Sequence, residues 1–183
     1  MSNQSFWKNG AIRSAKEVAR TAVFVAAAIG AQYALSAVPF VEVVSLLFIC
    51  YAFVFGVVRG TVAAVAFALL RQLLFGFYPV VLILYLIYFS MLAVVFGLLP
   101  RWCKWTGWKL LLIASLLAAV CAACFTMTDN LLTPWYYGYT PKAAQMYFNA
   151  SLPFLVGQTV CVCVSVAILF VPLTKALFFV KKA

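Results

Sequence analysis

The chain has 183 residues, of which 68% are hydrophobic and 9% are charged. This composition excludes a soluble globular domain, in which charged residues make up about a quarter of the total. Its 13 lysines and arginines outnumber 3 acids, and it has no histidine, so histidine-based catalysis and histidine-ligated metals are excluded. We interpret the chain as an integral membrane protein whose cations follow the positive-inside rule, and not as a nucleic-acid-binding protein.

Six apolar stretches near spanning length predict an all-α membrane protein with six transmembrane helices. A basic segment, residues 1–20, precedes them, and residues 21–183 are expected to form a single transmembrane domain. In chain order the predicted spans are residues 21–38, 43–58, 61–77, 80–99, 110–127 and 152–171. The first is interpreted as an uncleaved span rather than a signal peptide, because no polar mature domain follows it.

Two further features of the last third complete this prediction. Residues 128–151 are expected to form a long connection between the last two spans, and connections of this length are more often functional than plain turns. Ser151 is predicted to be the N-cap of the final helix. Pro172 is expected to kink that helix, which continues to Lys182.

The distribution of cations predicts the topology. With six crossings and the N-terminus inside the cell, every lysine and arginine except Lys142 and Arg71 falls on the inner side. Such an asymmetry favours cytoplasmic N- and C-termini in a multi-pass protein of the cell membrane. It places the aromatic connection around Asp129 outside the cell.

A row of small residues runs along the first span. Ala22, Ala26, Gly30 and Ala34 recur every four positions and therefore share one helix face. Such a face allows another helix to approach closely in a membrane. We expect Ala22, Ala26 and Gly30 to dock a partner helix, from this chain or from another protein.

Polar groups on the outer side are the best candidates for contacts to a substrate. Arg71 interrupts the third span about 9 Å below its predicted outer end, at 1.5 Å per residue. A charge at that depth is paired or lines a cavity. Arg71 is expected either to hold an anionic substrate group, or to pair with Glu42 or Asp129, or to snorkel to the interface. The full set of predicted substrate-binding residues is Glu42, Arg71, Gln72, Tyr78, Tyr85, Asp129, Asn130, Trp135, Tyr136 and Gln158.

The sequence contains no motif of a known catalytic or nucleotide-binding site. It has neither a P-loop nor an H-E-x-x-H helix, so we expect no catalytic residue, metal or cofactor. The Cys121-Ala-Ala-Cys124 spacing lies in an apolar span, where cysteine behaves as a small hydrophobic residue. The aromatic residues of 128–151 are expected to form a lid that stacks on a flat ligand.

Taken together, these features resemble the substrate-binding S component of energy-coupling factor (ECF) transporters, the vitamin importers of prokaryotes. The resemblance covers residues 15–175 and rests on the small-residue row and on four stretches: F-G-V-V-R-G (55–60), L-L-F-G-F-Y-P (73–79), D-N-L-L-T-P-W-Y-Y-G-Y (129–139) and A-S-L-P-F-L-V-G-Q-T-V (150–160). It implies capture of a vitamin-like small molecule, anionic or heterocyclic, at the outer face. It also implies docking of the first helix onto a transmembrane coupling subunit that works with two ATPase subunits.

Two other functions remain open at this point. A self-sufficient small transporter or channel would use the small-residue row as an interface between copies. A membrane enzyme acting on lipids through Asp129 is the weakest alternative, because no histidine or metal motif supports it.

Overall fold

The protein is an all-α membrane protein. A computed structural model describes residues 14–37, 43–102 and 107–182, which form six helices and no strand. The helices are α2 (Ala15–Leu35), α3 (Val43–Phe55), α4 (Val57–Phe75), α5 (Pro79–Trp102), α6 (Trp108–Tyr136) and α7 (Pro141–Lys182). All of them except α3 are both long enough and apolar enough to cross a membrane. Each of the six predicted spans therefore corresponds to a helix, although α3, with 13 residues, is shorter than a membrane span.

The predicted connection 128–151 is wrong, because most of it is helical. Helix α6 continues to Tyr136, α7 begins at Pro141, and residues 137–140 alone join them. The new helix start has local causes. Proline is tolerated in the first turn, where its missing N–H has no helical partner, and Thr140 caps the helix by accepting a hydrogen bond from the Ala143 N–H at 3.3 Å. Ser151, predicted as an N-cap, lies inside α7 instead.

Helix α3 lies at the centre of the bundle. It packs against α2, α4, α5 and α7, and its sequence has no polar face, as expected for a helix that is buried all round. Phe48 is fully buried and its ring lies 5.2 Å from that of Phe67 and 4.6 Å from that of Phe89, measured between centroids. This aromatic cluster joins α3, α4 and α5 into one core.

Helices α4 and α5 approach each other most closely at two glycines. A Cβ atom added to Gly97 of α5 would lie 2.6 Å from the backbone N of Val57. One added to Gly60 of α4 would lie 3.0 Å from the Cβ of Ala93. Small residues at these positions allow the two backbones to meet, as is common between helices in membranes.

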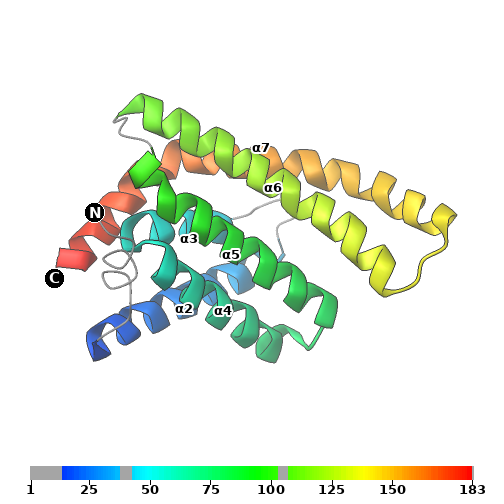
Figure 1. Ribbon diagram of the computed structural model, residues 1–183, viewed down its shortest axis with the longest axis horizontal. Coiled ribbons are helices and arrows are strands. Elements are labelled where there is room, and N and C mark those ends of the chain that lie inside the picture. Colours follow the sequence, from blue (N-terminus) through cyan, green and yellow to red (C-terminus); the bar gives the residue numbers. More distant parts are fainter. Residues whose placement is uncertain (1–13, 38–42, 103–106, 183) are drawn as a thin grey trace.

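The basic residues gather at one end of the molecule. There the start of α2 meets the start of α4 through an ion pair between Glu17 and Arg59. At the same end, the Lys181 Nζ of α7 donates a hydrogen bond of 2.6 Å to the carbonyl of Val54 at the end of α3. Figure 1 shows the end of α5 and the start of α6 at this end too, and the tip of the α6–α7 hairpin at the other. Among the described cations, Arg71 and Lys142 alone lie towards the opposite end.

The α6–α7 hairpin is the longest part of the structure. The two helices pack against each other along their length, and α6 also contacts α5. Beyond the ends of α4 and α5 that lie opposite the basic end, the hairpin continues alone (Figure 1). It therefore extends past the rest of the bundle at the end opposite the cations.

Candidate functional site

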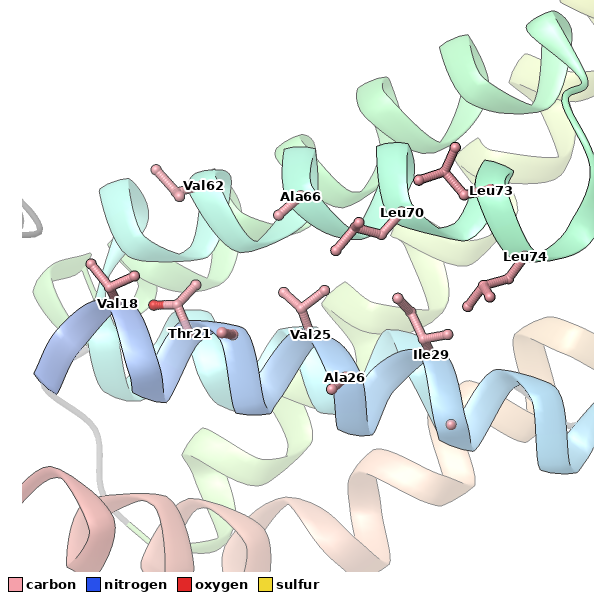
Figure 2. Close-up of a pocket in the computed structure, with 12 residues that line it drawn as sticks. Val18, Thr21, Val25, Ala26, Ile29, Val62, Ala66, Leu70, Leu73 and Leu74 are labelled. Atoms are coloured by element: carbon pink, nitrogen blue, oxygen red, sulfur yellow. The ribbon is translucent and has the colours of Figure 1, made fainter. Parts of the chain in front are cut away.

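An apolar groove runs between α2 and α4. Its volume is about 680 Å³, and its lining includes the predicted docking residues Ala22, Ala26 and Gly30. Figure 2 shows the facing wall, which is formed by side chains of α4. The labelled α4 residues are Val62, Ala66, Leu70, Leu73 and Leu74.

The small-residue row is exposed in this groove. Ala22, Ala26 and Gly30 all lie on the surface, and a Cβ added to Gly30 would meet no atom within 4 Å. Among the described residues, no helix covers the row, although α4 forms the facing wall of the groove. The sequence left open whether its partner lies within the chain, and the described structure supplies none.

Helix α2 is held to the bundle by a narrow face next to the row. Its buried residues are Thr21, Phe24, Val25 and Ala28. The Thr21 hydroxyl is hydrogen-bonded to the Tyr51 hydroxyl at 2.9 Å, and the Phe24 ring stacks on the Tyr51 ring with centroids 4.0 Å apart. These contacts fix the rotation of α2 about its own axis, so that the row of small residues faces away from the bundle.

A cavity that includes polar side chains lies between α6 and α7, in the half of their hairpin that is away from the basic end. Its volume is about 330 Å³, and Asp129 lines it together with Phe125, Tyr147 and Gln158. Each carboxylate oxygen of Asp129 accepts one hydrogen bond, from the Thr133 hydroxyl at 2.6 Å and from the Tyr147 hydroxyl at 2.7 Å. These two donors hold the carboxylate in a fixed orientation at the cavity wall.

The amide side chains near this cavity also join the two helices. Asn130 donates to the Ser151 hydroxyl at 2.8 Å, while its own Oδ1 is buried without a hydrogen-bond partner. The Thr126 hydroxyl donates to Gln158 Oε1 at 3.5 Å. Gln158 therefore links the two helices through Thr126 and also lines the cavity, where a ligand can contact it.

Arg71 is surrounded by aromatic rings. Its guanidinium carbon lies 5.0 Å from the Phe75 ring centroid and 4.7 Å from that of Tyr85. Its Nε and Nη1 atoms are buried without hydrogen-bond partners. In the described part of the chain, the structure records no ion pair between Arg71 and Asp129; Glu42, the other predicted acid, lies outside the described residues.

Arg71 also lies nearer the helix end than predicted. Because α4 ends at Phe75, Arg71 is one turn from its end, about 6 Å at 1.5 Å per residue. The difference from the predicted depth arises at Gly76, whose φ of 93° favours glycine and ends the helix early.

The other predicted residues of this region stabilise the turn between α4 and α5. Gln72 is 4% exposed, and its Oε1 accepts a hydrogen bond of 3.0 Å from the Tyr78 backbone N–H. Its Nε2 has no partner. Tyr85 accepts a hydrogen bond of 3.1 Å from Gln32 Nε2 of α2, and so ties α5 to α2.

Phe125 connects the surroundings of Arg71 with the Asp129 cavity. Its ring lies 6.1 Å from that of Tyr85, which covers Arg71, and it also lines the cavity. The structure thus brings α4, α5 and α6 together at the end opposite the basic one. Trp135 and Tyr136 belong to a different place, the exposed hairpin tip, and do not line this cavity. Of the aromatic residues predicted to form the lid, Tyr147 alone lines this cavity.

The prediction missed Phe125, which lines the cavity, and Thr133, which donates a hydrogen bond to Asp129. Thr133 follows Asp129 by four positions, and this spacing on a helix was a usable signal. Phe125 gave no local signal, because its position depends on how α6 packs against α5 and α7. In the described part of the chain, no group of three or more cysteines and acids could hold a metal ion. No known protein family, curated protein or solved structure matches this chain.

Proposed function

We propose that the chain is the substrate-binding subunit of an ECF-type importer of prokaryotic cell membranes. It would capture a vitamin-like small molecule at its outer end and dock onto a transmembrane coupling subunit that works with two ATPase subunits. The proposal rests first on the sequence resemblance. The gathering of cations at one end of the helix bundle also supports it, since this end is then cytoplasmic.

The observation that carries the proposal is the exposed small-residue row on α2. A binding protein without a nucleotide site needs a surface through which an energy-coupling partner acts on it. Ala22, Ala26 and Gly30 line a groove that a helix can enter closely, because no side chain larger than a methyl group projects from these positions. Association there relies on van der Waals packing, since lipid offers no hydrophobic driving force.

The outer half of the molecule supports the binding role. Arg71 has buried N–H groups without partners, and Asp129 lines a cavity of about 330 Å³ beside aromatic rings. Intramembrane charges of this kind mark substrate pathways. The partnerless Nε2 of Gln72 adds a donor near Arg71, and the two together suit an anionic group on the substrate.

Docking is tested by filling the groove. The double variant Ala22→Trp/Ala26→Trp should abolish copurification with the coupling subunit and uptake by cells, while the purified variant still binds substrate. Both positions are exposed, so the folded yield should be unchanged. Ala167→Trp, at an exposed position of α7, is the matched control and should leave association and uptake intact. Unchanged partner association in the double variant would refute the docking surface.

The same variants separate this proposal from an importer that works alone. A self-sufficient oligomeric transporter would move its substrate in liposomes without ATPase subunits, and the tryptophans would then dissociate copies of this chain. Uptake in such liposomes, lost together with self-association, would replace the proposed function by this second one.

A further inference from the structure

A second cleft flanks α2 on the side away from α4. Its volume is about 510 Å³, and side chains of α2, α3 and the end of α7 line it. Its lining includes Leu47 of α3, Leu177 of α7, and Val23 and Ala27 of α2. The walls are almost entirely apolar, so the body of this cleft suits a hydrocarbon group.

Two cations border this cleft on α2. Lys16 and Arg20 are among its lining residues and, four positions apart, share one face of the helix. Both lie near the start of α2, where the helix dipole adds positive potential. The acid nearest in sequence, Glu17, is ion-paired with Arg59 of α4. One end of an apolar cleft is thus positively charged.

The dimensions of the cleft select its occupant. Along α2 it extends from Lys16 to Ala27, about 16 Å at 1.5 Å per residue. This is close to half of the hydrocarbon core, which is about 30 Å thick. A partner's transmembrane helix crosses the full thickness of the hydrocarbon core, which is about twice the length of this cleft. An acyl chain of a phospholipid crosses only one leaflet, and this length matches the cleft.

We infer that this cleft binds one anionic phospholipid, with an acyl chain between α2, α3 and α7 and its phosphate at Lys16 and Arg20. Basic pockets between transmembrane helices on the cytoplasmic side are known sites for acidic lipid headgroups. Selectivity comes from the headgroup, because an acyl chain finds a similar apolar environment in the bilayer. The inference does not depend on the proposed function, since it concerns the isolated chain and its membrane.

Native mass spectrometry of the full chain in a mild detergent tests the site, with phosphatidylglycerol and phosphatidylcholine as probes. Phosphatidylglycerol should bind the parent protein more tightly. The double variant Lys16→Gln/Arg20→Gln should weaken this binding about 25-fold, from about fivefold for each cation at an anionic lipid surface. Lys175→Gln/Lys182→Gln removes the same charge from exposed positions at the same end, outside the cleft, and should leave the affinity unchanged.

A third variant tests the cleft without a change of charge. Ala27→Trp fills it from an exposed position and should weaken phosphatidylglycerol binding, even if the charge variant folds poorly. Equal affinity for the two lipids, or equal phosphatidylglycerol binding by parent and both cleft variants, would overturn the inference. It would also be overturned by a dimer of the chain that Ala27→Trp dissociates, since a second copy would then be the occupant.

Discussion

The same substitution should have opposite effects at two glycines of this fold. In Gly97→Ala, the new Cβ would lie 2.6 Å from the backbone N of Val57 and 2.9 Å from its Cα. Backbone atoms cannot rotate away, so α4 and α5 must separate along the core that they share. In Gly30→Ala, the new methyl group would meet nothing within 4 Å.

The expected magnitudes follow from these distances. Overpacking of this kind costs about 1–3 kcal/mol, and a clash with backbone belongs at the upper end. For a chain of this size that lowers the midpoint of thermal unfolding by about 5–10 °C. Gly30→Ala should instead raise stability by up to about 1 kcal/mol, because alanine is the better helix former.

Thermal unfolding of the purified variants in one detergent, followed by size-exclusion chromatography, measures both effects. Gly60→Ala is an intermediate case, since its new Cβ would meet the Ala93 methyl at 3.0 Å. The expected order of midpoints is therefore Gly30→Ala, Gly60→Ala, Gly97→Ala, from highest to lowest. A Gly97→Ala midpoint equal to that of the parent would refute the close contact between α4 and α5.

Two further predictions concern charges. Arg71→Ala should reduce substrate affinity more than it reduces the yield of folded protein, because the buried Nε and Nη1 atoms have no protein partner to lose. Titration calorimetry with a copurified ligand measures the affinity. Equal binding by variant and parent would exclude an anion site. Glu17→Gln should destabilise the protein by about 1–3 kcal/mol, because it leaves the half-buried Arg59 without its charged partner. The charge swap Glu17→Arg/Arg59→Glu should recover part of that loss in thermal unfolding, and no recovery would show that the pair itself contributes little.

The spans were predictable because each is a long apolar stretch, and in a membrane such a stretch must form a helix. The short hairpin between α6 and α7 was not predictable, because residues such as Pro134, Gly138 and Pro141 commonly interrupt helices. Pro134 lies in the last turn of α6 and Pro141 opens α7, so neither removes a hydrogen bond from the middle of a helix. These residues indicated a turn correctly, but not how short it is.

The candidate site was predictable in part. Arg71 and Asp129 were noticed because charges within or beside apolar spans are rare. Their neighbours depend on distant packing, since Tyr85 of α5 covers Arg71 and Tyr147 of α7 bonds Asp129. A sequence lists these rings without indicating which of them meet. The ion pair of Glu17 with Arg59 was missed for the same reason, being 42 positions apart.

Helix α7 is longer than the hydrocarbon core is thick, so part of it lies outside that core. Its 42 residues extend about 63 Å, whereas a hydrocarbon core of about 30 Å occupies only about 39 Å of a helix tilted by as much as 40°. The remainder lies in headgroups and water at the two ends of the helix, and Lys142 stands at one of them. The other described lysines lie towards the opposite end, so an amine-reactive label that cannot cross the bilayer distinguishes the two faces of the membrane by this single side chain.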